Sequence, residues 1–185
     1  MTQLESNYTC PWWLLFTFDN PLRKLIHNPH KILRPYVKAG STVLDVGCGM
    51  GYFSLELARL VGPQGKVFAA DLQPRMLAGL ERRSHKAGLQ TVIQPHLCGA
   101  NSIGLTEPVD MIFAFWMVHE VSDRKAFLQE LFSLLKPDGV LLIVEPLIHV
   151  TQKNFEYTLD LGNEIGFSEI SHPEVAVSRS VVFLK

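Results

Sequence analysis

Long apolar segments are missing from this sequence of 185 residues. The longest uninterrupted apolar run, Met111–Val118, is far shorter than the roughly 20 residues that a membrane-spanning helix needs. The N-terminus also lacks a basic region, and Glu5 precedes its first apolar run, a pattern that is not typical of a secretory signal. These absences predict a cytoplasmic protein that does not insert into a membrane.

Cysteine is scarce and charge is balanced. The three cysteines, Cys10, Cys48 and Cys98, are odd in number and form no C-x-x-C pair, which argues against a disulfide framework and a structural zinc site. His27 and His30 are spaced like metal ligands, but no third ligand stands near them in the sequence, so no metal is expected. The net charge of −1 provides no field that would attract nucleic acid.

Segments with strand character alternate with helical segments of about 10–15 residues along one domain, residues 1–185. This alternation predicts an α/β fold, a Rossmann-like and mostly parallel sheet of seven strands with helices on both faces. The predicted strands are Thr42–Gly47, Lys66–Asp71, Thr91–Leu97, Val109–Met117, Val140–Glu145, Phe167–Ser171 and Ser180–Leu184. Helices are expected at Tyr52–Val61, from Pro74 to Gly88, after a capping Ser122 and at Thr151–Ile165, with a turn at Lys136–Gly139. Asn28-Pro29 is typical of a further helix start.

The loop after the first predicted strand lacks the third glycine of the dinucleotide fingerprint G-x-G-x-x-G. That position is Tyr52 when counted from Gly47, and Ser54 when counted from Gly49. The loop instead has a glycine at every second position up to Gly51, and Asp45 stands two residues before the first of them. A carboxylate there would repel a pyrophosphate but suits a cationic ligand, such as an α-amino group or a sulfonium.

Asp71 ends the second predicted strand, about 20 residues after the glycine loop, where an acidic residue can accept hydrogen bonds from both ribose hydroxyls. A nucleoside with an amino-acid tail and no phosphate meets both requirements, and S-adenosylmethionine is such a molecule. Two plainer interpretations stay open. Asp45 can cap local backbone amides, and Asp71 can be a favourable charge before the helix that starts near Pro74.

The set of motifs resembles class I S-adenosylmethionine-dependent methyltransferases, in particular the small-molecule group that includes the ubiquinone/menaquinone-biosynthesis enzymes. The matching segments are "VLDVGCGMGYFS", "VFAADLQPRML", "VDMIFAFWMVHEV" and "LLKPDGVLLIVEP", which cover roughly Thr42 to Pro146. The resemblance implies an antiparallel C-terminal strand, S-adenosyl-L-methionine as cofactor and S-adenosyl-L-homocysteine as product. It also implies an S-adenosylmethionine-binding core over residues 41–185.

The resemblance assigns cofactor contacts to the glycine loop and to the loops that follow the next strands. One departure concerns the adenine, because "LCGANS" after the third strand offers no carboxylate where the family commonly has one. Backbone groups or Asn101 are expected to bind the adenine instead. The complete predicted cofactor set is Asp45, Gly47, Cys48, Gly49, Gly51, Asp71, Leu72, Gly99, Ala100, Asn101 and Phe115.

Methyl transfer is an in-line displacement that needs no side-chain catalyst unless the acceptor must lose a proton. Three candidates for a general base lie where buried strands end. His119 and Glu120 follow the fourth predicted strand, and Glu145 ends the fifth. Each also has a structural interpretation, as a hydrogen-bonded core histidine, a charge near a helix start and a partner of loop amides.

Acceptor specificity is expected to come from residues 1–40, a segment rich in aromatic residues, as a lid over the core. The predicted pocket for the small-molecule acceptor contains Trp12, Trp13, Trp116 and His119. The alternatives are that the tryptophan pair covers a helix surface or forms a homodimer contact.

Other functions remain as alternatives. Three converging thiols could bind trivalent arsenic, as in arsenite methyltransferases. A protein that binds the cofactor without catalysis would carry the same motifs. An oxidoreductase is disfavoured because Tyr157 is followed by Leu161 rather than lysine four residues on. Amino-methylating nucleic-acid enzymes carry (Asp/Asn)-Pro-Pro-(Tyr/Phe) where this chain reads "AFWM".

Overall fold

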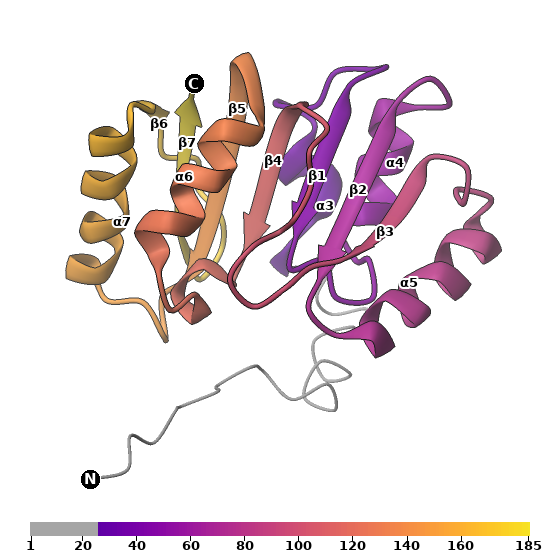
Figure 1. Ribbon diagram of the computed structural model, residues 1–185, viewed down its shortest axis with the longest axis horizontal. Helices are drawn as coiled ribbons and strands as arrows, with labels where there is room; N and C mark the ends of the chain where they lie inside the picture. The colour runs from indigo at the N-terminus through magenta and orange to yellow at the C-terminus, as the bar shows by residue number, and fades with distance from the viewer. Residues whose placement is uncertain (1–25) are drawn as a thin grey trace, which may run out of the picture.

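The computed structural model describes residues 26–185, and these residues form a seven-stranded sheet in the order β3-β2-β1-β4-β5-β7-β6 (Figure 1). Strands β1 to β5 pair in parallel, whereas β7 runs antiparallel to both β5 and β6. The predicted fold class is therefore confirmed. The strands are β1 (Thr42–Val46), β2 (Lys66–Asp71), β3 (Ile93–Leu97), β4 (Val109–Phe115), β5 (Leu135–Pro146), β6 (Ser168–Ser171) and β7 (Ser178–Leu184).

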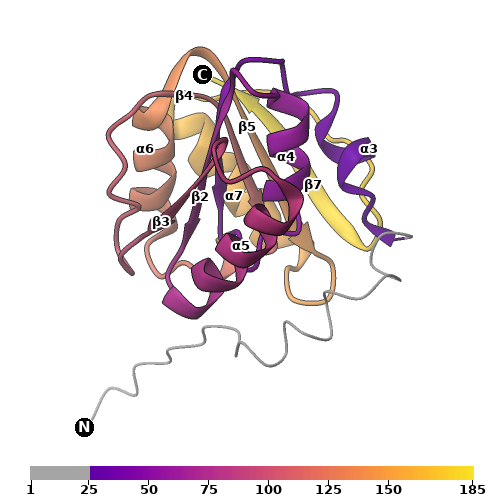
Figure 2. The same ribbon diagram turned by 90° about the vertical axis from the view of Figure 1, so that its right-hand side faces the viewer.

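Helices cover both faces of the sheet (Figure 2). Strands β1 and β4 are buried on both faces along most of their length, and β4 is apolar except for Asp110. One face packs against α6 (Arg124–Leu134) and α7 (Gln152–Ile165), and the other against α3 (Pro29–Leu33), α4 (Ser54–Val61) and α5 (Pro74–Ala87). None of these helices, within residues 26–185, is long and apolar enough to cross a bilayer.

Two helix starts test the capping predictions. Asn28 caps α3 as its position before Pro29 predicts, since its side chain accepts a hydrogen bond from the Lys31 amide at 3.2 Å. The prediction for Ser122 is wrong. Asp123 caps α6 instead, and its carboxylate accepts a hydrogen bond from the Ala126 amide at 2.9 Å. Asp123 stands three residues before Ala126, the spacing at which a cap side chain reaches a free amide.

The predicted turn at Lys136–Gly139 lies inside β5 rather than before it. Leu135 already pairs with Val109 of β4, and pairing resumes at Val140 opposite Met111. The four intervening residues bulge out of the ladder, with Asp138 in a left-handed conformation at φ 61°.

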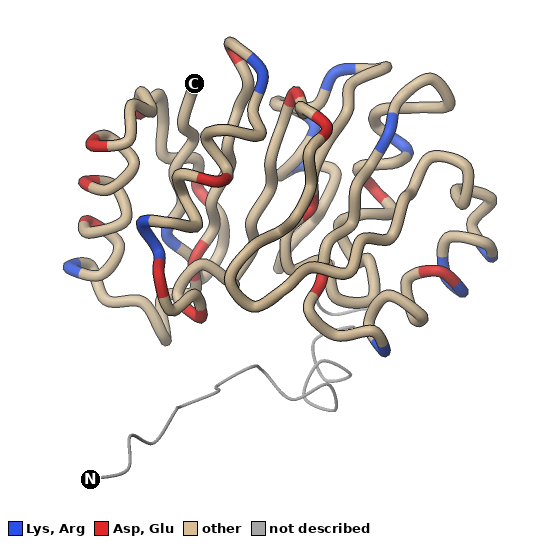
Figure 3. The backbone as a smooth tube through the Cα atoms, in the orientation of Figure 1, with Lys and Arg blue, Asp and Glu red and all other residues tan. Residues whose placement is uncertain are grey.

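The strand order reverses between β1 and β4, because the chain proceeds from β1 outward to β2 and β3 and returns to β4 on the other side. In open parallel sheets, ligands bind outside the carboxyl ends of the strands at such a point. Basic and acidic side chains are interspersed over the elements, apart from an exposed acidic series on α7 (Figure 3): Glu156, Asp160 and Glu164.

Candidate functional site

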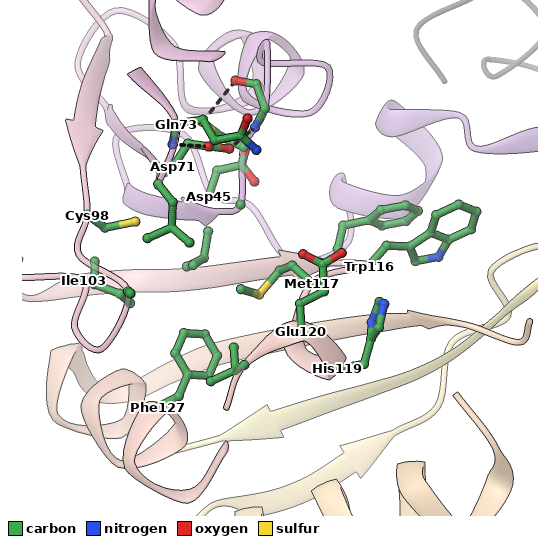
Figure 4. A pocket seen from close by; sticks show the side chains of 18 of the residues that line it. Asp45, Asp71, Gln73, Cys98, Ile103, Trp116, Met117, His119, Glu120 and Phe127 are labelled. Atoms are coloured by element: carbon green, nitrogen blue, oxygen red, sulfur yellow. Dashed lines mark hydrogen bonds between the residues drawn. The ribbon is translucent and has the colours of Figure 1, made fainter. Parts of the chain in front are cut away.

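A cavity of about 640 Å³ opens at the carboxyl ends of the central strands (Figure 4). This volume lies within the range of about 300–1,000 Å³ that is usual for small-molecule sites. In the figure, Asp45, Asp71 and Gln73 lie toward one end, and Trp116 and His119 lie toward the other. The site therefore has two parts, one at the glycine loop and one at the ends of β4 and β5.

The glycine loop has a backbone that side chains would disturb. Gly47, Gly49 and Gly51 all have positive φ, at 71°, 54° and 81°. A Cβ atom at Gly51 would lie 2.2 Å from Cδ1 of Leu80, which is fully buried on α5. A Cβ atom at Gly47 would lie 3.0 Å from Cγ of Met117. The loop thus needs glycine both for its conformation and for close contact with its neighbours.

Asp71 connects the glycine loop to the turn after β2. One carboxylate oxygen accepts a hydrogen bond from the Gly49 amide at 2.9 Å, and the other accepts one from the Gln73 amide at 2.8 Å. Burial raises the pKa of this carboxyl, and the two backbone hydrogen bonds oppose that rise. Each carboxylate oxygen has a second lone pair, so the side chain can still accept hydrogen bonds from a pair of hydroxyl groups in the cavity.

Asp45 is 2% exposed at the carboxyl half of β1 and also lines the cavity. It accepts a hydrogen bond from the hydroxyl of Ser54, the first residue of α4, at 2.5 Å. The lining carries three further carboxylates, Asp71, Glu120 and Asp123, but only one guanidinium within the described residues, that of Arg83. This excess of negative charge suits a cationic ligand.

The loop after β3 closes the side of the cavity that faces Asp71. Gly99, Ala100 and Asn101 line it, and so does Leu72, which follows β2. This loop is held from α6, because Glu130 accepts hydrogen bonds from the Ser102 hydroxyl and from the Ile103 and Gly104 amides, at 2.8–3.1 Å.

Trp116 forms the wall at the other end. It has φ 57°, a conformation that costs a bulky residue about 1–3 kcal/mol unless its surroundings hold it. Its amide donates to the Val144 carbonyl at 2.7 Å, and its indole N–H donates to the Ser178 hydroxyl at 2.9 Å. Its ring stacks on Phe115, with centroids 5.2 Å apart, and meets the buried His27 edge to face. The strained conformation is thus held by neighbours from β5, β7 and the segment before α3.

Glu145, at the end of β5, is 2% exposed and does not belong to the cavity lining. Its carboxylate accepts hydrogen bonds from the amides of Val118 and His119 and from Nδ1 of the His119 ring, which is 2.8 Å away. His119 and Glu120 line the cavity from η1 (Val118–Glu120). Of the three predicted base candidates, two therefore face the cavity and the third holds one of them.

Comparison with known proteins adds the family. Residues 37–175 match the family model described as a methyltransferase domain. The chain belongs to the class I S-adenosylmethionine-dependent methyltransferases.

Relatives of this family member include enzymes named for quinone biosynthesis. A demethylmenaquinone methyltransferase of Lactobacillus johnsonii is 34% identical over 110 residues, which are 59% of this chain and 45% of that protein. The ubiquinone/menaquinone biosynthesis C-methyltransferase UbiE of Serratia proteamaculans is 31% identical over 146 residues, 75% of this chain and 57% of that protein. The chain spans about half the length of the curated relatives it matches.

One solved structure matches this chain over almost the full length of both chains. The S-adenosylmethionine-dependent methyltransferase from Aquifex aeolicus is 29% identical, with a TM-score of 0.86. The match covers 95% of this chain and 99% of that chain.

Two thiols of this methyltransferase-family chain line the cavity, Cys48 and Cys98. Burial, followed by the charge of Asp45, raises the pKa of Cys48 well above its usual value. Burial and the charge of Asp71 raise the pKa of Cys98 to about 11. A raised pKa leaves less of the thiolate, the form that binds soft ions such as trivalent arsenic, near neutral pH. Cys10, the third thiol of that alternative, lies outside the described residues.

The two histidines with ligand-like spacing, His27 and His30, take other partners. Nε2 of His27 donates to the Ala176 carbonyl at 2.9 Å, and Nδ1 of His30 lies 2.8 Å from the Glu56 carboxylate. Over residues 26–185, no group of three or more His, Cys, Asp or Glu side chains is arranged to hold a metal ion.

All the predicted cofactor residues except Gly51 line the cavity. Gly51 instead packs against the Leu80 side chain of α5. Trp116 and His119 belong to the lining, whereas Trp12 and Trp13 lie outside the described residues. The sequence analysis did not predict several other lining residues. They lie after the ends of strands or in the first turn of α6, and their place at the carboxyl ends of the strands could have indicated that they line the cavity. These are Gln73, Met117, Val121, Phe127, Ile148 and His149.

Proposed function

We propose that this protein transfers a methyl group from S-adenosylmethionine to a small-molecule acceptor by in-line displacement. The observation that carries the proposal is the cavity at the strand-order reversal. It combines a loop of positive-φ glycines with two buried carboxylates, Asp45 and Asp71, on adjacent strands.

The residues present fit this cofactor. Asp71 keeps lone pairs for the two ribose hydroxyls while its backbone hydrogen bonds fix its position. The Asp45 carboxylate suits the ammonium of the methionine part. Leu72, Gly99, Ala100 and Asn101 form the walls for the adenine, and Phe115 adds an apolar surface near the glycine loop. When bound, S-adenosylmethionine supplies a methyl group activated by its sulfonium.

The protein's own contribution is to align the acceptor with that methyl group and to exclude water. Trp116 and Phe115 offer flat aromatic surfaces for a planar acceptor. Some relatives are named for ubiquinone and menaquinone biosynthesis. We therefore propose an aromatic quinol as the acceptor class, methylated in the cytoplasm.

The proposal is tested by calorimetric titration of the purified protein with S-adenosylhomocysteine, S-adenosylmethionine and NAD. We expect micromolar binding of the first two and none of NAD. Asp71→Ala should abolish binding, whereas Asp160→Asn, a charge change on the exposed face of α7, should not affect it. Binding of NAD alone would contradict the assignment of the loop.

Transfer is then measured with methyl-labelled S-adenosylmethionine and 1,4-naphthohydroquinone as the acceptor. Label in the naphthol product is the expected result. Tight cofactor binding without transfer to any acceptor would favour the alternative of a non-catalytic binding protein.

A further inference from the structure

The contacts of Glu145 fix the hydrogen position on His119. A carboxylate only accepts hydrogen bonds, so Nδ1 of His119, 2.8 Å from Oε2 of Glu145, carries the ring hydrogen in the neutral imidazole. The lone pair is then on Nε2, on the opposite side of the ring. The amide of His119 donates to the same carboxylate at 3.1 Å, which holds backbone and ring together.

The ring belongs to the acceptor end of the cavity. His119 lines it with a side chain that is 20% exposed, and Trp116 and Glu120 lie on the same side (Figure 4). The ring stacks on His149, which follows β5, with centroids 5.9 Å apart and an interplanar angle of 10°. Its orientation is thus set from two sides while it stays in contact with the cavity.

We propose that His119 accepts the proton of the methyl acceptor, and that Glu145 positions the ring for this transfer. This inference rests on the proposed function and narrows it. The acceptor must bear an O–H or acidic C–H group that loses its proton as it is methylated.

The atoms and electrons of the step balance. The acceptor's O–H or C–H bond breaks, and its proton forms the N–H bond at Nε2 of His119. The electron pair that is released makes the acceptor the nucleophile for the bond to the methyl carbon. The pair of the broken carbon–sulfur bond remains on sulfur, which becomes a neutral thioether. The imidazolium then returns its proton to water.

The groups around His119 set the pH range of this proton transfer. Burial lowers the pKa of the imidazole, but the hydrogen bond and charge of Glu145 and the charge of Glu120 outweigh burial and the opposing Arg124 on α6. The pKa is therefore raised above its usual value of 6.5. Only the neutral ring accepts a proton. We therefore expect kcat to be low below the raised pKa of His119 and to increase as the pH rises through it.

The chain contains a matched control. His172 and Glu169 form a second imidazole–carboxylate pair, with Nε2 of His172 2.6 Å from the carboxylate, and this pair also raises the histidine pKa, mainly through that hydrogen bond. Neither residue lines the cavity. His172→Asn therefore changes the same kind of pair away from the acceptor.

The first measurement needs no acceptor. Nitrogen NMR of the ¹⁵N-labelled histidine rings is recorded against pH for the wild-type protein, Glu145→Gln and His172→Asn. We expect His119 in its Nδ1–H form with a pKa above 6.5, lowered in Glu145→Gln and unchanged in His172→Asn. An Nε2–H tautomer of His119, or a His119 pKa that is the same in Glu145→Gln as in the wild-type protein, would contradict the hydrogen bond between His119 and Glu145.

The second measurement compares two acceptors, 1,4-naphthohydroquinone and 2-hydroxy-1,4-naphthoquinone, which is already ionised at neutral pH. His119→Asn leaves the backbone bonds of Glu145 in place. It should lower kcat with the first acceptor by about 100-fold or more and spare the second, which reaches the site as a nucleophilic anion that has already lost its O–H proton. S-adenosylhomocysteine affinity should stay unchanged.

The outcomes separate the two proposals. Absence of S-adenosylhomocysteine binding by the wild-type protein, or methylation of neither acceptor, would contradict the proposed function itself. Normal binding and transfer with equal losses for both acceptors in His119→Asn, or with no loss for either, would overturn the proton-accepting role and leave the cofactor site intact.

Discussion

Single residues at this site serve geometry as much as chemistry. Trp116 adopts a left-handed conformation that bulky residues rarely take, and three neighbouring segments hold it there. Glu145 does not line the cavity, yet it orients both the backbone and the ring of His119. The side chains that line the pocket therefore depend on buried partners one step behind them.

Gly51→Ala tests how closely the glycine loop packs on α5. A Cβ atom there meets the buried Leu80 side chain at 2.2 Å and also strains the backbone at φ 81°. Gly40 has nearly the same φ, 79°, with nothing within 4 Å of the added atom. We expect Gly51→Ala to lower the free energy of unfolding by about 1–3 kcal/mol more than Gly40→Ala.

Denaturant titrations of both variants give that difference directly. Gly51→Ala should also weaken S-adenosylhomocysteine binding, whereas Gly40→Ala should not. Equal destabilisation by the two substitutions would mean that Leu80 moves aside freely and that only backbone strain matters.

At the scale of elements, α6 contributes more to the site than its place on one face of the sheet suggests. Its first turn, with Asp123, Ala126 and Phe127, lines the cavity. Further along, Glu130 accepts three hydrogen bonds from the loop after β3. This helix thus connects the loop proposed for adenine binding to the acceptor end.

Glu130→Gln tests that connection. The neutral amide accepts weaker hydrogen bonds and brings an N–H group toward the loop amides, so the loop should loosen. We expect a loss of about 1 kcal/mol in S-adenosylhomocysteine binding, close to fivefold in affinity. Glu164→Gln, the same change on exposed α7, is the control in the same calorimetric titration. An unchanged affinity in Glu130→Gln would show that the loop is held by other contacts.

At the scale of the whole molecule, the cavity lies where the two halves of the sheet diverge. The wall at the glycine loop comes from β1, β2 and the loops after them, and the opposite wall from β4, β5 and the helices that follow. A ligand that fills the cavity contacts both halves at once. Binding should therefore stabilise the fold as a unit.

Thermal unfolding measures this coupling. A ligand at 100 times its dissociation constant stabilises the folded state by about 2.7 kcal/mol. For a chain of this size, that free energy corresponds to a rise in Tm of about 5–10 °C. We expect this rise with S-adenosylhomocysteine for the wild-type protein and no rise for Asp71→Ala. Equal shifts in both proteins would place the ligand elsewhere.

Local sequence signals were sufficient for the fold and for the part of the cavity at the glycine loop. Apolar strands buried on both faces, helical periodicity and glycines at alternate positions act over a few residues, so they can be recognised without knowledge of distant contacts. The family resemblance added the antiparallel C-terminal strand. These signals pointed to Asp45, Gly47, Gly49 and Asp71, which line the same cavity.

Only the tertiary structure decided how the other half of the site is divided. His119, Glu120 and Glu145 were equivalent candidates in the sequence, because each lies at or just after the end of a buried strand. The pairing of β4 with β5 brings residues 26 positions apart within 2.8 Å and separates the roles, with Glu145 buried behind the imidazole of His119. The contacts of Trp116 with Ser178 and His27 depend in the same way on distant segments. Such contacts join residues far apart in the chain, and no local pattern encodes them.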